Sequence, residues 1–302
     1  MAVAPHCPAD PAPLPVSNGA LAVPRSGKTH DMSFQVHAAL TTPFREDGWV
    51  DLDAMRLHIE LLAEDGIDGL VPAGTTGEGP LLEESEIATL VATAVQTSAG
   101  RLEVIAHVGR ASTPATVRLA RAAVGSGADA VIAITPYYYD FDQAALRSHY
   151  RELLAAVEDV PVLAYTFPDR AGNVLASETL DELAGEGLAG LKDSTKSPER
   201  HAEYQEVAAR HPGFRLFVGA EALALQAMQG GSAGTISALA NARADSLLRV
   251  REEASEEAQQ AIVRAREELP GIPEVKQAVR ERLAERGADY PAAPRGPLAA
   301  VA

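Results

Sequence analysis

From Phe34 onward, hydrophobic residues fall into two alternating kinds of segment. Eight short runs are almost continuously apolar, and each precedes a longer stretch whose apolar residues follow helical spacing. The apolar runs are 35–40, 67–73, 102–107, 128–134, 160–165, 187–192, 215–218 and 233–237. The helical stretches are 52–63, 84–97, 114–126, 143–157, 177–185, 198–209, 221–229 and 241–253. This pattern predicts eight parallel strands, each followed by a crossover helix.

Eight such units predict an α/β protein with a (β/α)8 TIM barrel over residues 33–253, close to the ~250 residues this fold normally uses. Continuous apolar runs are typical of strands that are covered on both faces. A doubly wound open sheet is the alternative, but Thr41-Thr42-Pro43-Phe44 does not provide the glycine fingerprint expected at its first turn. Residues 254–302 predict a charged C-terminal helical appendage that ends in coil.

Two helix-to-strand junctions resemble each other: Gly66-Ile67-Asp68 and Gly127-Ala128-Asp129. A glycine at such a junction is typical of a helix C-terminus with a left-handed residue, followed at once by a strand. We interpret both junctions as structural.

Composition limits the classes of function. With a net charge of −16, neither nucleic acid nor an anionic membrane surface is an expected partner. Cys7 is the only cysteine, which excludes a disulfide framework and suits a reducing, cytoplasmic compartment. No apolar run has the length of a membrane span. Residues 1–32 are rich in proline and alanine and predict a disordered N-terminal extension.

One strand candidate ends in a lysine. Lys192 closes the run 187–192, and the chain has only four lysines beside 22 arginines. A buried lysine amine is held in its neutral form by desolvation and forms Schiff bases with carbonyl substrates. A lysine that extends to solvent, or that pairs with Asp193, explains this segment equally well.

In a barrel, chemistry collects where strands end, and these positions carry further polar groups. The glycine-rich loop 74–79 is either a tight turn or a nest of N–H groups that holds a carboxylate. Arg170 is either a surface residue or a bidentate clamp for a carboxylate. For Tyr137 and Tyr139, aromatic packing is the default interpretation.

Two further motifs are interpreted as structural. His107 ends a strand candidate, and we expect a core histidine whose hydrogen bonds are satisfied. Residues 230–234 match the G-x-S-x-G pattern, but they lead into a strand instead of from a strand to a helix, so we reject a nucleophilic serine there. The eight histidines show no metal-binding spacing, and no metal site is expected.

Together, the strand-end motifs resemble the dihydrodipicolinate synthase / N-acetylneuraminate lyase family of class I pyruvate-dependent aldolases. The resemblance runs from about residue 36 to 298. The motifs that carry it are Thr42-Pro43-Phe44, Gly74-Thr75-Thr76-Gly77-Glu78, Pro136-Tyr137-Tyr138, Tyr165, Gly190-Leu191-Lys192 and Ile272-Pro273-Glu274-Val275-Lys276.

The resemblance implies a carbon–carbon lyase that works without a cofactor, through a covalent imine between Lys192 and pyruvate. Tyr165 would be the general acid and base, and Thr75 would connect it to Tyr138 of a neighbouring subunit. A homo-oligomer, a dimer or a homotetramer built as a dimer of dimers, is therefore implied.

The resemblance also implies two small-molecule substrates, pyruvate and an aldehyde. The amides of Thr75 and Thr76 would hold the pyruvate carboxylate, and Arg170 the carboxylate of the aldehyde. Gly234 and Ile236, on the eighth strand candidate, are placed with the substrate site.

Departures from the family pattern bear on the substrate. Thr166 and Tyr139 stand where asparagine is usual. Tyr137-Tyr138-Tyr139 and Lys192-Asp193-Ser194 favour an aldolase for 2-keto-3-deoxy sugar acids, whereas Arg170 and the paired threonines favour a synthase-like enzyme. A non-catalytic ligand-binding barrel is the third alternative. The positions at which lysine-inhibited synthases bind their effector hold poorly matching residues, so no inhibition by lysine is predicted. These residues are Glu84, Ile87, Arg110 and Ala115.

Overall fold

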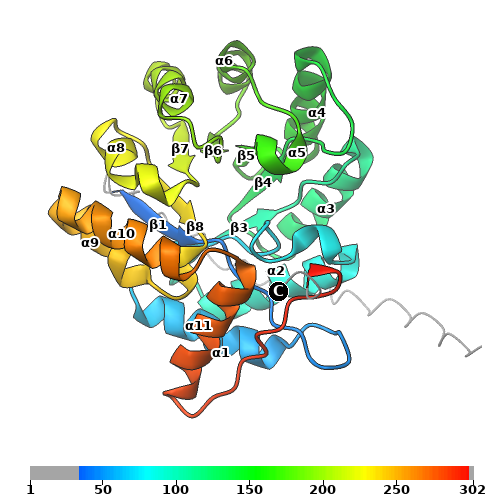
Figure 1. Cartoon of the computed structure of the whole chain (residues 1–302). Coiled ribbons are helices and arrows are strands. Elements are labelled where there is room, and N and C mark those ends of the chain that lie inside the picture. Colours follow the sequence, from blue (N-terminus) through cyan, green and yellow to red (C-terminus); the bar gives the residue numbers. More distant parts are fainter. Residues whose placement is uncertain (1–33, 299–302) are drawn as a thin grey trace, which may run out of the picture. The chain divides into compact units, whose positions relative to one another are not determined.

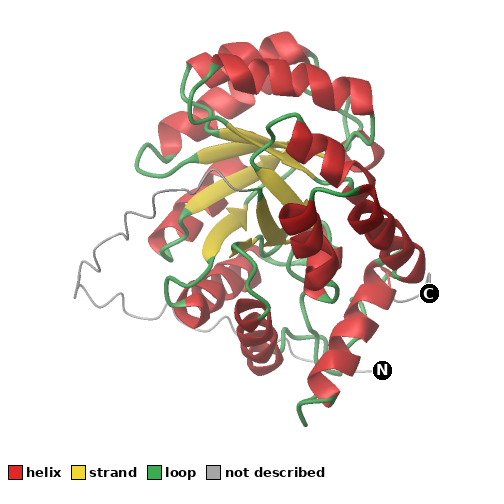
Figure 2. Cartoon of the chain, turned by 90° about the vertical axis from the view of Figure 1, so that its left-hand side faces the viewer, coloured by secondary structure: helices red, strands yellow, loops and turns green. Residues whose placement is uncertain are grey.

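A computed structural model describes residues 34–298 and contains the expected barrel (Figure 1). All eight strands are parallel and pair in sequence order, and β8 pairs with β1 to close the barrel. Figure 2 shows helices surrounding the strands on the outside. The predicted N-terminal extension, 1–32, lies outside the described residues.

The elements follow the predicted order closely. The strands are β1 Gln35–Ala38, β2 Gly69–Leu70, β3 Glu103–His107, β4 Ala130–Ile134, β5 Val162–Thr166, β6 Gly190–Asp193, β7 Arg215–Val218 and β8 Gly234–Ser237. The α-helices are α1 Leu52–Glu64, α2 Glu84–Ser98, α3 Thr113–Gly125, α4 Gln143–Ala156, α5 Pro168–Ala171, α6 Ser177–Gly185, α7 Pro198–Arg210, α8 Ala224–Gln229, α9 Ala244–Glu253, α10 Glu256–Glu268 and α11 Ile272–Ala284. Short 3-10 helices are η1 Gly79–Leu81, η2 Glu221–Leu223 and η3 Leu239–Asn241.

Two elements differ from the sequence-based expectation. β2 has only two residues, because Ala73 adopts a φ of 58° and turns the chain into the glycine-rich loop instead of extending the strand. The short helix α5 was not predicted. Its proline in the first turn suits a helix start, but four residues are too few to show helical spacing in the sequence.

The two similar junctions have a common structure. Gly66 and Gly127 adopt φ values of 80° and 91°, as predicted for glycines that end a helix. The aspartate two residues later in each junction accepts a hydrogen bond from a neighbouring strand: Asp68 from the amide of Val36 at 2.7 Å, and Asp129 from the amide of Val104 at 2.8 Å. The repeated motif therefore joins adjacent strands at the start of the barrel.

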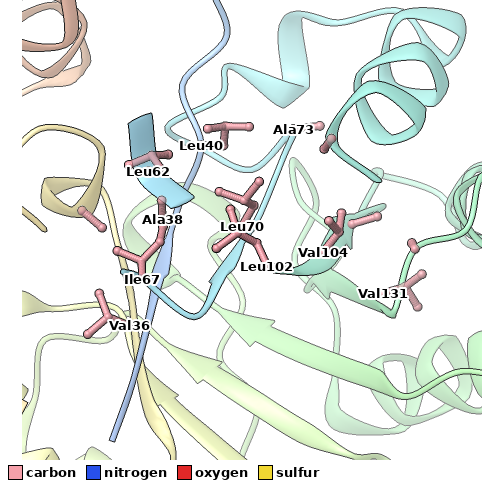
Figure 3. Close-up of a cluster of buried hydrophobic side chains, with 14 of the residues drawn as sticks. Val36, Ala38, Leu40, Leu62, Ile67, Leu70, Ala73, Leu102, Val104 and Val131 are labelled. Atoms are coloured by element: carbon pink, nitrogen blue, oxygen red, sulfur yellow. The ribbon is translucent and has the colours of Figure 1, made fainter. Parts of the chain in front are cut away.

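The outward faces of the strands pack against the helices and form the larger hydrophobic core. Figure 3 shows Val36, Ala38, Leu70 and Val104 of successive strands gathered with Leu62 of α1. A second, smaller cluster fills the inside of the barrel. Since side chains alternate between the two faces of a strand, every second residue points inward, as a filled barrel requires.

A charged group lies at the N-terminal end of β3 inside the barrel. The carboxylate of Glu103 accepts hydrogen bonds from His37 and Arg215, each at 2.9 Å. Burial alone would raise the pKa of Glu103, but these two partners lower it to about 2. The cluster closes the interior opposite to the end where the candidate chemistry collects.

The C-terminal helices form the predicted appendage. α10 packs against α9, and α11 packs against α1, where Arg282 makes a two-pronged ion pair with Asp65 at 2.7 and 2.9 Å. Among residues 34–298, no helix is long and apolar enough to cross a lipid bilayer.

Candidate active site

Lys192 is buried inside the barrel, with only 7% of its surface exposed. It pairs in register with Tyr165 of β5, and its Nζ lies 4.4 Å from the centroid of the Tyr165 ring. The carboxylate of Asp193 is bonded instead to His201 at 2.9 Å and to the amide of Thr195 at 2.8 Å. Of the interpretations left open for Lys192, the structure therefore supports the buried amine, and the solvent-exposed and Asp193-paired alternatives are wrong.

The hydroxyl of Tyr165 meets the glycine-rich loop. Its OH lies 3.3 Å from Oγ1 of Thr75, so the predicted Lys192–Tyr165–Thr75 grouping is brought together by β6, β5 and the loop after β2. Tyr165 is 2% exposed. The phenol of Tyr165 therefore has the Lys192 amine over its ring and the Thr75 hydroxyl near its oxygen, with little access to water. Such a phenol is suited to transferring protons within the site.

The loop from 74 to 79 is wound tightly enough to require glycine. A Cβ on Gly79 would lie 1.9 Å from the carbonyl oxygen of Ala73, and one on Gly77 would lie 2.6 Å from that of Leu40. Within the part of the chain that the structure describes, the amides of Thr75 and Thr76 have no hydrogen-bond acceptor. The tight turn is confirmed, and two available N–H groups are what the predicted carboxylate site requires.

A buried ion pair, which the sequence did not reveal, fixes this loop. Glu78 adopts a left-handed conformation, and its carboxylate lies 2.9 Å from Nζ of Lys276 on α11, with both side chains 0% exposed. The amide of Arg295 donates to the same carboxylate at 2.7 Å. The C-terminal appendage therefore anchors the loop that carries Thr75 and Thr76. The available signals for Lys276 were the scarcity of lysine in the chain and its place in the motif 272–276, and neither identified Glu78 as its partner.

Of the three tyrosines after β4, Tyr137 is half-buried and packs against the cluster inside the barrel, as expected, whereas Tyr138 and Tyr139 are exposed. Tyr138 is 85% exposed with a φ of 84°, and Tyr139 is 67% exposed. Within the described chain, the Tyr139 ring makes an aromatic contact with the Tyr138 ring but is not packed into the core as expected. Asn173, which the sequence analysis missed, holds this segment: its Nδ2 donates to the carbonyls of Pro136 and Tyr139 at 2.8 and 2.9 Å. Arg170, on α5, is exposed at the same rim.

The two positions assigned on β8 have different surroundings. Ile236 is 1% exposed and belongs to the cluster inside the barrel. A Cβ on Gly234 would lie 2.2 Å from the carbonyl oxygen of Gln35, so glycine is required there for close packing of β8 against β1. Contact of either residue with substrate stays a prediction.

Ser232 belongs to a buried chain of side chains. His201 bonds through Nδ1 to Asp193 and through Nε2 to the hydroxyl of Ser232, both at 2.9 Å. These distances match a Ser-His-Asp triad, but Ser232 is 8% exposed and precedes β8, so it does not lie at the strand-to-helix turn that a nucleophile elbow requires. These hydrogen bonds instead fix the position of Asp193, the residue that follows Lys192.

His107 contradicts the sequence-based expectation. It is 5% exposed and meets the Tyr165 ring edge-on, with 6.1 Å between centroids. Among the described residues, its Nε2 has no hydrogen-bond partner, so the expected satisfied core histidine is wrong for this atom. Burial, followed by the charges of Arg110 and Lys192, lowers its pKa to about 3.

Comparison with known proteins places these features in one family. The model of the dihydrodipicolinate synthetase family matches residues 32–302. A 4-hydroxy-tetrahydrodipicolinate synthase of Thiobacillus denitrificans is 41% identical over 205 residues, which cover 67% of this chain and 68% of that protein.

Solved structures agree with this match. Dihydrodipicolinate synthase of Aquifex aeolicus is 30% identical with a TM-score of 0.71, covering 78% of this chain and 81% of the other. The prophage protein YagE of E. coli K12, crystallised in complex with pyruvate, is 23% identical with a TM-score of 0.80, covering 87% of this chain and 92% of the other, and it supports the fold alone.

Proposed function

Because this chain belongs to the dihydrodipicolinate synthetase family of lyases, we propose that it forms a Schiff base between Lys192 and pyruvate and joins pyruvate to a small carboxylated aldehyde, or cleaves it from one. The observation that carries the proposal is the buried amine of Lys192 over the Tyr165 ring, with the Tyr165 hydroxyl in reach of Thr75.

Each residue has a distinct task in this reaction. The amides of Thr75 and Thr76 bind the pyruvate carboxylate, which places the C2 carbonyl beside the Lys192 amine. The Lys192 nitrogen adds to C2, and Tyr165 gives a proton to the oxygen that leaves as water. The imine draws electrons from C3, which loses a proton to the Tyr165 phenolate. The resulting enamine carbon attacks the aldehyde, and Tyr165 supplies the proton that the new alkoxide takes up. We propose that no cofactor takes part.

The acceptor aldehyde is proposed to carry a carboxylate, because Arg170 is exposed on the rim where such a group would enter. Thr166 does not bear on this choice, because it is fully buried and its hydroxyl is 3.5 Å from the amide of Leu175, on the outer face of β5. The aldolase for 2-keto-3-deoxy sugar acids, which Tyr137-Tyr138-Tyr139 and Lys192-Asp193-Ser194 favour, ranks second to the synthase-like enzyme that Arg170 and the paired threonines favour.

We also propose that the active unit is at least a dimer. Tyr138 presents a largely exposed ring, which suits a residue that completes the site of a neighbouring subunit. Light scattering tests this directly: a monomer that is fully active would remove Tyr138 from the proton relay.

Reductive trapping tests the central claim. The protein is incubated with pyruvate and borohydride, and the adduct is located by intact mass and peptide mapping. We expect one pyruvate-sized adduct on Lys192 and none on Lys276, since the Lys276 amine is already bonded to Glu78 and to the carbonyl of Ala293.

The matched control is Lys192→Arg, which keeps the charge but cannot form the imine. If the wild-type protein is folded and no adduct appears, the proposed function is wrong and a non-catalytic binding barrel replaces it. If the adduct forms, pyruvate consumption with a panel of aldehydes identifies the second substrate class.

A further inference from the structure

His107 holds a hydrogen-bond acceptor that the fold does not use. The residue is the last of β3, and Ile105, two residues earlier, belongs to the cluster inside the barrel, so His107 faces the same interior. Its imidazole lies edge-on to the Tyr165 ring, and the same ring lies 4.4 Å from Nζ of Lys192. The side chain of His107 therefore lies on the inner face of the barrel wall, beside the proposed reaction centre.

The protonation of the ring follows from its contacts. The backbone carbonyl of Ala73 favours a hydrogen on the ring, and Nε2 has no partner among the described residues. We assign the hydrogen to Nδ1, because Nε2 is the ring nitrogen without a partner, and Nε2 then carries a lone pair. With a pKa of about 3, the ring is neutral at every pH at which the protein would work.

A buried acceptor without a donor is costly, and natural structures contain few of them. The cost is removed if a donor arrives with the substrate. Pyruvate itself brings no hydrogen-bond donor at neutral pH, but its adduct with Lys192 does. When the nitrogen lone pair bonds to C2, the carbonyl electron pair moves to oxygen, and a proton transferred from nitrogen makes this oxygen a hydroxyl.

We propose that Nε2 of His107 accepts a hydrogen bond from the hydroxyl of the carbinolamine that forms on Lys192, which makes His107 a further residue of the reaction centre. Holding that hydrogen turns an oxygen lone pair toward the phenol of Tyr165. Tyr165 then protonates the oxygen, the C2–O bond breaks with its electron pair, water leaves, and the nitrogen lone pair forms the imine. This inference rests on the proposed function.

Two nearly isosteric substitutions separate this role from a structural one. In His107→Gln the side-chain oxygen can occupy the position of Nε2, so the acceptor is kept. In His107→Asn the side-chain amide can occupy the position of Nδ1, so the N–H group assigned to that position is kept and the acceptor is lost. If His107 had only a structural role, the asparagine variant would keep more activity than the glutamine variant. We expect the opposite order.

The readout is the rate of borohydride trapping at saturating pyruvate. We expect His107→Asn to trap about tenfold more slowly than the wild-type protein, the effect of one lost hydrogen bond in the rate-limiting step. We expect His107→Gln to stay within about threefold, and the pyruvate concentration for half-maximal trapping to change little in both.

His149 supplies the matched control. It is also buried, its Nε2 also lacks a partner among residues 34–298, and its Nδ1 bonds to Thr113 at 2.9 Å, but it lies on α4 in the helix layer. The asparagine and glutamine variants of His149 should trap at the wild-type rate.

The outcomes are distinguishable. No trapping by the wild-type protein overturns the proposed function itself. Trapping by the wild-type protein together with an unchanged rate in His107→Asn, or with a slower rate in His107→Gln than in His107→Asn, overturns only the role of His107.

Discussion

Replacement of Lys276 by methionine tests how strongly the C-terminal appendage supports the glycine-rich loop. In the native protein, Lys276 and Glu78 form an ion pair at 2.9 Å with both side chains 0% exposed. Methionine fills a similar volume but leaves the carboxylate, among residues 34–298, with the amide of Arg295 as its one remaining donor. Breaking a buried pair in this way costs roughly 3–5 kcal/mol, because a buried charge is left uncompensated.

The double variant Glu78→Gln/Lys276→Met separates the charge effect from packing. Glutamine is neutral and its oxygen can still accept from the Arg295 amide, so the second substitution should recover at least about 2 kcal/mol of the loss. The comparison variant is Arg56→Met, which breaks an exposed pair with Asp53 and should change stability little.

The stability of the wild-type protein and of the three variants is measured by urea unfolding. The midpoint and slope of each curve together give the change in the free energy of unfolding. The trapping rate with pyruvate serves as a second readout, since a loosened loop should bind the carboxylate less well. A loss below about 1 kcal/mol in Lys276→Met, or a double variant no more stable than Lys276→Met, would refute the reasoning.

Three further outcomes are expected. Gly219→Ala should slow trapping and lower stability by about 1–3 kcal/mol, because its Cβ would lie 2.1 Å from the Ser194 hydroxyl and 3.0 Å from Cε of Lys192, whereas Gly125→Ala meets no atom within 4 Å and should be neutral. Stability should fall as the pH drops from 6.5 to 4: burial lowers the pKa of His58 and His149 to about 4, so the unfolded chain takes up protons first, at a cost of up to about 3 kcal/mol per histidine. Urea midpoints measured across this pH range test the expected loss of stability, and His149→Leu should make the midpoint depend less on pH. A midpoint that stays constant with pH contradicts the prediction. Millimolar lysine should leave activity unchanged, and a clear drop in the rate would disprove the prediction.

The lysine prediction gains support from the surroundings of the positions concerned. Ile87 is 1% exposed in the core, and the guanidinium of Arg110 donates to the carbonyls of Gly79 and Leu82 at 2.9 and 3.2 Å. Glu84 forms an ion pair with Arg118 at 3.0 Å. These side chains therefore already have partners within the protein.

The sequence by itself determined the fold and the central group of the candidate site. Eight apolar runs with helical stretches between them permit few arrangements, since parallel strands need crossover helices and both sheet faces must be covered. Because the ends of parallel strands meet at one end of a barrel, the same reasoning placed Lys192 and the loop 74–79 at a common rim, whereas the grouping of Lys192 with Tyr165 and Thr75 followed from the resemblance to the family. Local pattern was sufficient for the fold, and the family motifs supplied the central group.

Tertiary structure alone decided which polar groups have partners. Glu78 and Lys276 are 198 residues apart, and nothing in their local sequence distinguishes a buried pair from two surface charges. The same holds for Asn173, whose amide fixes the tyrosine segment, and for His107, whose expected hydrogen bonds are incomplete. Burial and pairing depend on which distant segments meet, and hydrophobic periodicity encodes the face of an element but not the partner that its polar groups find there.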